Sequence, residues 1–171
     1  MHIIGIDPGA QGALVLLDAD QRIKDWADMP SHNITVAGKK RAAIDVHGLA
    51  AVLRGWAEIA DFAVLEQVAS MPKQGVASTF AFGRAAMAPE MALAAFNVPF
   101  NLVTPAVWKR VMQANGDKDD ARRRASQLMP QDAHIWPNKA NADRAEAALM
   151  ALYGLRVYAK QTATGRGGLL G

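Results

Sequence analysis

The chain has 171 residues, of which 51% are hydrophobic and 20% are charged, and its formal net charge at pH 7 is +3. This size and balance are typical of one globular domain with a sizeable core. The absence of cysteine excludes disulfides and thiolate metal sites, so any metal ion must have oxygen or imidazole ligands. No apolar stretch reaches the roughly 18 residues of a membrane span, and the N-terminus lacks a signal-peptide pattern, so we expect a soluble, cytoplasmic protein without membrane contact.

The chain begins with predicted strands. Residues 2–7 (HIIGID), 13–18 (ALVLLD) and 22–29 (RIKDWADM) are β-type runs, and the turns between them are short enough for antiparallel hairpins. These runs predict a meander of three strands.

A helix and a strand are predicted to follow the meander. Residues 31–42 are polar and show no period, so they are expected to form a mobile loop. Asp45 is a candidate N-cap for a helix over 46–59. The continuous apolar run 62–68 (FAVLEQV) predicts a strand buried on both faces, and a Gly-containing loop over 69–75 follows it.

The middle of the chain predicts a long helix and another strand. Residues 76–96 are rich in Ala and Met and favour a helix, which Pro89 is expected to kink or split. Residues 98–104 predict a strand, and the pair Thr104 and Pro105 suits the start of the next helix.

Helices are predicted to complete one domain over residues 1–158. They cover residues 106–113, about 119–129, and a final segment from a cap at Asn141 to about residue 158. The Gly-rich tail 159–171 is expected to be flexible. The order of elements predicts the α/β class, with a mixed five-stranded sheet and helices on both faces.

Two acidic residues stand at the ends of predicted strands. Asp7 ends the first apolar run, and Glu66 interrupts the run 62–68. Burying a carboxylate without compensation costs several kcal/mol, roughly. The nearest cation downstream of Glu66 is Lys73, so a shared metal ion is the economical explanation for both acids.

Two further acids lie in the last predicted helix. Asp143 and Glu146 are three residues apart, which places both carboxylates on one helix face. Each acid alone has a structural alternative, since Asp also caps helices and stabilises turns. Together, four acids at strand ends and a helix start favour a hard divalent cation, which prefers carboxylate oxygens.

Five separated motifs resemble the RuvC family of Holliday junction resolvases, in the ribonuclease H-like superfamily, with a phage-type member as one possibility. They are GIDPG, LEQV, TPAVWK, the DK pair at 117–118 and NADRAEAALMAL, and they run in order from residue 2 to about residue 154. The resemblance implies a ribonuclease H-like fold and four catalytic, metal-binding acids: Asp7, Glu66, Asp143 and Glu146. The family pattern has Asp at the last of these positions, so Glu146 is a departure that keeps the charge and adds one methylene.

The same resemblance implies a mechanism and two catalytic lysines. Lys109 of TPAVWK and Lys118 of the DK pair would lie near the cleaved phosphate; without the family, both would be interpreted as solvated helix residues. Two Mg²⁺ ions, for which Mn²⁺ is a plausible substitute, would assist hydrolysis of a phosphodiester. The expected function is cleavage of branched DNA, in particular resolution of four-way junctions.

Clustered basic residues are the candidates for DNA binding, and the positions are Lys39, Lys40, Arg41, Lys73, Arg84, Arg122, Arg123 and Arg124. Contacts with phosphates would depend on salt and would be largely blind to sequence. For residues 122–124 an equally good alternative is a solvated helix face. Because a four-way junction has two-fold symmetry, we expect a homodimer, with the Ala-rich segment 76–96 as its interface or else as an ordinary core helix.

A second departure concerns the junction centre. Many relatives carry an aromatic residue shortly after the LEQV glutamate, where it wedges into the junction, but residues 69–72 here read Ala-Ser-Met-Pro. Phe80 and Phe82 are nearby candidates, although their surroundings favour core or dimer contacts. Weaker selectivity among branched substrates is therefore expected.

Three other functions are compatible with parts of the pattern. An actin-like ATPase module also places Asp in a Gly-containing hairpin, but that architecture needs two such domains. A ribonuclease H-like nuclease for other branched DNA or RNA substrates would share the same acids. A structure-specific DNA-binding protein without activity would not need the four acids.

Overall fold

The computed structural model describes residues 1–36, 38–69 and 75–163. Its elements, in chain order, are β1 (His2–Asp7), β2 (Ala13–Asp18), β3 (Ile23–Asp28), β4 (Ser31–Val36), β5 (Lys39–Ile44), α1 (Val46–Ala57), β6 (Phe62–Glu66), α2 (Val76–Ala95), β7 (Phe100–Val103), α3 (Pro105–Met112), α4 (Lys118–Leu128), η1 (Pro130–Ile135), η2 (Lys139–Asn141) and α5 (Ala142–Ala163).

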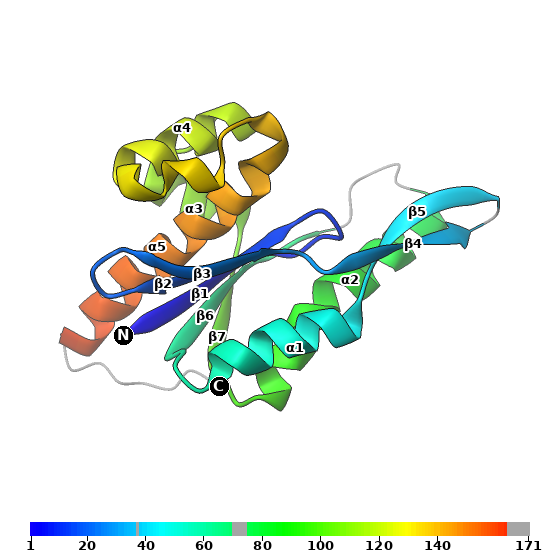
Figure 1. Ribbon diagram of the computed structural model, residues 1–171, viewed down its shortest axis with the longest axis horizontal. Helices are drawn as coiled ribbons and strands as arrows, with labels where there is room; N and C mark the ends of the chain where they lie inside the picture. The colour runs from blue at the N-terminus through cyan, green and yellow to red at the C-terminus, as the bar shows by residue number, and fades with distance from the viewer. Residues whose placement is uncertain (37, 70–74, 164–171) are drawn as a thin grey trace.

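The central sheet has five strands in the order β3-β2-β1-β6-β7 (Figure 1). The first three strands pair antiparallel, as the short turns predict, whereas β1, β6 and β7 run parallel. The predicted mixed five-stranded sheet is therefore confirmed.

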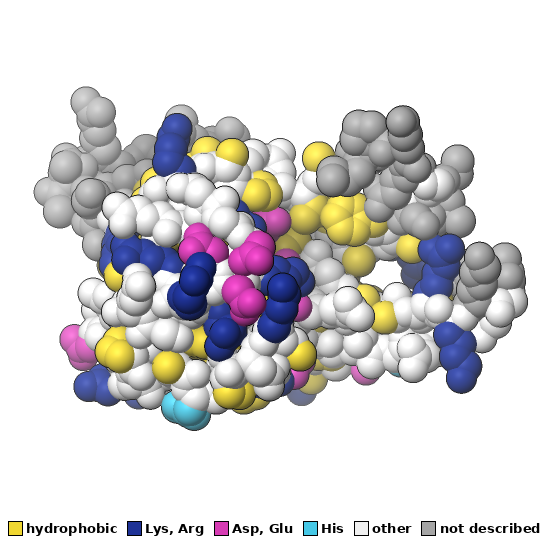
Figure 2. Space-filling view, turned by 90° about the horizontal axis from the view of Figure 1, so that it is seen from above, with side chains coloured by type: hydrophobic (Ala, Val, Ile, Leu, Met, Phe, Trp, Pro, Cys, Tyr) yellow, Lys and Arg dark blue, Asp and Glu magenta, His cyan; other side chains and the backbone are white. Residues whose placement is uncertain are grey.

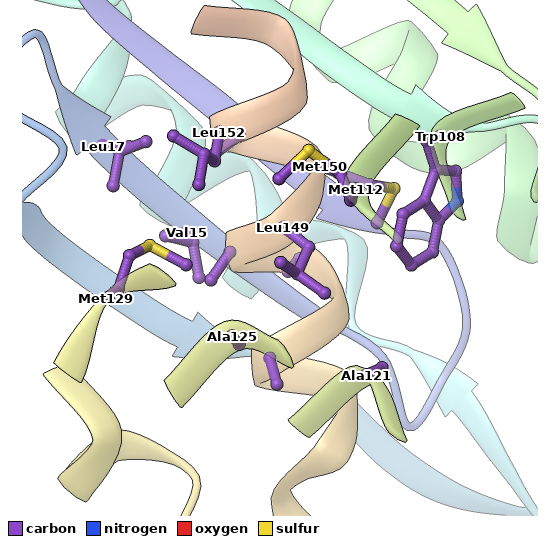
Figure 3. Packing of buried hydrophobic residues seen from close by; sticks show 14 of the residues in the cluster. Val15, Leu17, Trp108, Met112, Ala121, Ala125, Met129, Leu149, Met150 and Leu152 are labelled. Carbon is purple, nitrogen blue, oxygen red and sulfur yellow. The ribbon is translucent and has the colours of Figure 1, made fainter. Parts of the chain in front are cut away.

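Helices cover both faces of this sheet because its central strands β1, β2 and β6 are buried on both sides. Along β1, Ile3 faces one core cluster, shared with α4 and α5, and Ile4 faces the other, shared with α1 and α2. Figure 3 shows the first cluster, where Val15 of β2 lies near Leu149 of α5. Each face thus buries its own layer of helices, as predicted.

Gly5 lets α5 lie directly on β1. A Cβ atom at this position would overlap the main-chain carbonyl oxygen of Ala147 and the amide nitrogen of Ala151. Only glycine leaves room for such a close approach of helix and strand. The contact fixes the height of α5 above the sheet.

The predicted loop over 31–42 is wrong. The chain forms β4 and β5 there, an antiparallel hairpin whose register pairs Ser31 with Ile44 and Val36 with Lys39. Ile34 and Val36 alternate with polar residues, a strand signal, and Gly38 takes the positive φ of 75° that a tight turn requires. Among the residues that the structure describes, the hairpin forms a separate two-stranded sheet, and Figure 1 shows it projecting beyond the end of α2.

Two helices differ from their predicted extents. Pro89 does not split α2, which is continuous from Val76 to Ala95, because one missing N–H removes a single bond from a long Ala-rich helix. The final helix begins after Asn141, which ends η2, and continues past residue 158 to Ala163. The rest of the predicted tail lies outside the described residues.

The described part of the chain contains no helix that is both long and apolar enough to span a membrane.

Candidate active site

The two strand-end acids leave the sheet at the same edge. Asp7 is the last residue of β1 and Glu66 is the last residue of β6. These parallel strands pair Ile6 with Leu65, so each acid follows directly after a paired residue. The carboxyl ends of parallel strands form the edge at which ligands bind in many α/β sheets.

The turn after Asp7 explains the glycines of the opening motif. Gly12 donates its N–H to the carbonyl of Gly9 at 2.9 Å, which closes the turn. A Cβ atom on Gly12 would overlap the carbonyl oxygen of Asp7. The Gly-rich segment therefore lets β2 return immediately beside the carboxylate.

The two acids of α5 lie over this edge of the sheet. Asp143 and Glu146 lie at the start of α5, the helix that Gly5 allows onto β1. One oxygen each from Asp7, Asp143 and Glu146 lies within 4.8 Å of the others. Figure 2 shows acidic side chains gathered on one face with Lys and Arg side chains around them.

Glu66 belongs to the same neighbourhood but not to this group of three. Its Oε2 accepts a hydrogen bond of 2.8 Å from Nε1 of Trp108, a fully buried side chain of α3. Sequence reasoning missed this partner. A signal for it existed in TPAVWK, since a buried indole N–H usually needs an acceptor.

Both predicted lysines are bound to the helix acids. Nζ of Lys109 lies 2.9 Å from Oε1 of Glu146, and Nζ of Lys118 lies 2.5 Å from Oδ1 of Asp143. The side chain of Lys109 is 27% exposed, so it is not a solvated helix residue. Asp117 caps α4 by accepting the N–H groups of Asp119 and Asp120, which places Lys118 in the first turn, facing the acids.

The pKa values of the two sheet acids, Asp7 and Glu66, are higher than that of an ordinary carboxyl. Burial raises the pKa of Asp7 well above its usual value, and the negative charges of Glu146 and Asp143 raise it further, while Lys118 opposes this. Burial also raises the pKa of Glu66, against the hydrogen bond from Trp108, which lowers it. Such clustered, perturbed carboxyls are typical of functional sites.

The predicted DNA-binding residues are distributed over several elements. Lys39, Lys40 and Arg41 lie in β5, and Arg84 is exposed on α2. Lys73 lies outside the described residues. Arg124 donates to the carbonyl of Met112 at 2.8 Å, so it ties α4 to the end of α3.

The remaining two arginines of this set pair with acids of α4, and Nη1 of Arg122 also donates to the carbonyl of Pro137 at 3.2 Å. Arg122 lies 3.3 Å from Asp119, and Arg123 lies 3.2 Å from Asp120. Both pairs are spaced i, i+3 on α4 and leave part of each guanidinium exposed. Arg124 and Arg122 thus bind main-chain carbonyls outside α4, whereas Arg123, whose side chain is 69% exposed, fits the alternative of a solvated helix face.

Known structures share this fold, although no family model and no curated protein matches the chain. A structure titled Thermus thermophilus RuvC is 14% identical, with a TM-score of 0.58, and the match covers 92% of this chain and 97% of that one. Thermus thermophilus RuvC in complex with a Holliday junction substrate is 16% identical, with a TM-score of 0.62, covering 92% and 96%. The chain has the fold of RuvC. The predicted ribonuclease H-like fold class is thus confirmed.

Proposed function

We propose that the chain is a metal-dependent endodeoxyribonuclease that resolves four-way DNA junctions by paired phosphodiester hydrolysis. The observation that carries this proposal is the meeting of Asp7, Asp143 and Glu146 at the open edge of a RuvC-like sheet. Branched DNA as the substrate is supported by the similar structure that was solved with a Holliday junction substrate.

The donor set fits a hard divalent cation. Three carboxylate oxygens within 4.8 Å approach the separation of about 3–4 Å that ligands of one such ion adopt. We propose Mg²⁺, with Mn²⁺ as a substitute, and a second ion toward Glu66. When bound, these ions supply activation of water and stabilisation of the leaving oxygen.

The lysines have a role in the same reaction. Lys109 and Lys118 lie 2.9 and 2.5 Å from Glu146 and Asp143, two of the proposed metal ligands, which supports a position of both ammonium groups beside the scissile phosphate. Charge that develops on a phosphate is stabilised by fixed cations of this kind. We assign both lysines to that role.

A homodimer would supply the two cuts that a symmetric junction needs. Along α2, Phe80, Met87 and Met91 are 69%, 51% and 62% exposed, and their spacing places them on one helix face. Exposed apolar stripes of this kind are usual where protein surfaces meet. We propose that α2 packs against a second copy of the chain. The exposure of Phe80 also shows that this residue is not part of the core.

DNA contacts are proposed for Lys39, Lys40, Arg41, Lys73, Arg84, Arg122 and Arg123. These residues lie on β5, α2 and α4 or in the segment before α2, and phosphate contacts would make binding strongly dependent on salt. Action on DNA in the cytoplasm is the setting that we propose for this activity.

The deciding experiment compares cleavage of four-way, three-way, flap, forked and linear DNA in Mg²⁺, with Asp7→Asn as the matched inactive control. We expect cleavage of branched substrates, and, because residues 69–72 offer no aromatic wedge, comparable rates on three-way and four-way DNA. Cleavage of RNA substrates instead would favour the broader nuclease alternative. Binding of junctions without any metal-dependent cleavage would favour the non-catalytic alternative.

A further inference from the structure

Arg144 links the start of α5 to the edge strand β3. Its Nε and Nη2 donate to the two carboxylate oxygens of Asp28, both at 2.6 Å, and its Nη1 donates to the carbonyl of Ile135 at 3.0 Å. The guanidinium also stacks on the ring of Trp26, 4.2 Å from its centroid. This bidentate, stacked arrangement holds the arginine in one orientation.

The strand register connects this link to the candidate active site. Asp7 of β1 pairs with Ala13 of β2, and Ala13 pairs in turn with Asp28 of β3. Asp7 and Asp28 therefore stand on one transverse row of the sheet, two strands apart. Arg144, which follows Asp143 directly, binds this same row at Asp28.

We propose that Arg144 and Asp28 form a clamp that positions Asp143 and Glu146 over Asp7 and so sets the affinity of the site for a divalent cation. Arg144 and Asp28 are positioning residues, since neither belongs to the group of three carboxylates. This inference rests on the proposed metal-dependent function. Loss of residues that orient metal ligands typically weakens metal binding about 10–100-fold.

The sign of one effect separates positioning from simple electrostatics. Arg144 is a cation beside an acidic site, so removing its charge would, by Coulomb attraction alone, tighten binding of a divalent cation. A clamp predicts the opposite, because the helix acids lose their fixed position over Asp7. Removing Asp28 weakens binding under either explanation, so Arg144 is the decisive residue.

The chain contains a matched control for the Asp28→Ala variant. Asp25 also lies on β3, and its Oδ2 accepts a hydrogen bond of 2.9 Å from Nε1 of Trp56 in α1, on the opposite face of the sheet. Asp25→Ala removes the same charge from the same strand, together with the bond to Trp56 and a local bond of 2.8 Å that Asp25 accepts from the main-chain N–H of Trp26. It leaves the link to α5 in place.

The test measures Mn²⁺ affinity by calorimetry on the full chain without DNA, together with the melting temperature of each protein. We expect Arg144→Gln and Asp28→Ala to weaken Mn²⁺ binding by about 10-fold or more. The double variant is expected to bind no more weakly than the weaker single variant, because both changes break one interaction. Asp25→Ala is expected to bind Mn²⁺ like wild type.

Arg144→Lys covers the case in which Arg144→Gln melts below the assay temperature. It keeps the charge but loses the bidentate geometry, so weakened Mn²⁺ binding is again expected. Wild-type or tighter affinity in the folded arginine variant, or fully additive losses in the double variant, would overturn the clamp. The proposed metal-dependent function has its own control, Asp7→Asn, which should weaken Mn²⁺ binding. If the wild-type protein bound no Mn²⁺, or if Asp7→Asn did not weaken the binding, that function would fail, and the clamp with it.

Discussion

The sheet acids and the helix acids of the candidate active site are compensated in different ways. Asp143 and Glu146, on α5, each have a lysine within 2.9 Å. Asp7 has a pKa raised by burial and by its acidic neighbours, and the donor to Glu66 within the described residues is a neutral indole. The demand for an added cation is therefore concentrated on the sheet side, and above all on Asp7.

The largest effect is expected from removing the carboxylate of Asp7. Asp7→Asn should lower the rate of junction cleavage by about a thousandfold or more, roughly 4 kcal/mol in activation free energy. Binding of a four-way junction without Mg²⁺ should stay equal or become tighter, because the variant removes a negative charge from a phosphate-binding surface. Cleavage rates and gel-shift affinities measure the two effects, and a rate within about tenfold of wild type would contradict the assignment of Asp7.

The helix side is tested at the residue that departs from the RuvC pattern. Glu146→Gln should slow cleavage by about a hundredfold, since it removes a ligand charge and the ion pair with Lys109. Glu146→Asp keeps the charge and should retain most of the activity. If the Gln variant cleaved at the wild-type rate, Glu146 would be only an ion-pair partner for Lys109.

The neutral donor to Glu66 is the next point of difference. Trp108→Phe removes the indole N–H, so the pKa of Glu66 should rise further, because that hydrogen bond lowers it. The acid limb of the pH–rate profile should move to higher pH, and the rate at neutral pH should fall by about tenfold or less.

A second buried tryptophan provides the control for this change. Nε1 of Trp136 donates to Oγ of Ser126 at 2.9 Å and touches none of the four acids by a hydrogen bond. Trp136→Phe should cost similar stability and leave the pH profile in place. Equal shifts in both variants would remove the assigned link between Trp108 and Glu66.

The smallest expected effect is on stability without metal. Because the folded state raises the pKa of Asp7 above its ordinary value of 3.8, the folded protein holds this proton more tightly than the unfolded chain. The resulting stability is present below pH 3.8 and is lost as pH rises through the raised pKa. In EDTA, Asp7→Asn should therefore melt at a higher temperature than wild type near neutral pH, with little difference near pH 4.

Calorimetric melting curves across pH test this, at about 2–4 °C for each kcal/mol in a chain of this size. Added Mg²⁺ should reverse the order, since it stabilises only the wild-type site. A difference in melting temperature that did not change with pH would contradict a raised pKa of Asp7 in the metal-free fold.

Local signals were sufficient for most of the fold. Apolar runs bounded by turn residues predicted the five strands of the central sheet, and Asp45 caps α1 as predicted, accepting the N–H of His47 at 3.1 Å. The hairpin over 31–44 was missed because most described side chains of its two strands are exposed and many are polar, so hydrophobicity gave only a weak pattern. Its alternating Ile34 and Val36 were the weak signal that remained.

The candidate site was only half accessible from the sequence. Strand-end acids and acids spaced i, i+3 on a helix can be recognised locally, and the structure brings Asp7, Asp143 and Glu146 together. Their compensation depends on tertiary packing: Lys109 and Lys118 come from α3 and α4. No spacing rule predicts Arg144 pairing with Asp28, a residue more than a hundred positions earlier.

Gly5 fixes the distance between α5 and β1 in a way that mutation cannot adjust. In most cores the distance between a helix and a strand can be tuned by enlarging or trimming the side chains between them. Beneath α5 the main chains of helix and strand meet at Gly5, so there is no side chain to resize at that layer. In a directed-evolution experiment that selects for a larger or smaller metal ion, we therefore expect successful changes in the reach of the ligands, such as Glu146→Asp, and none at Gly5.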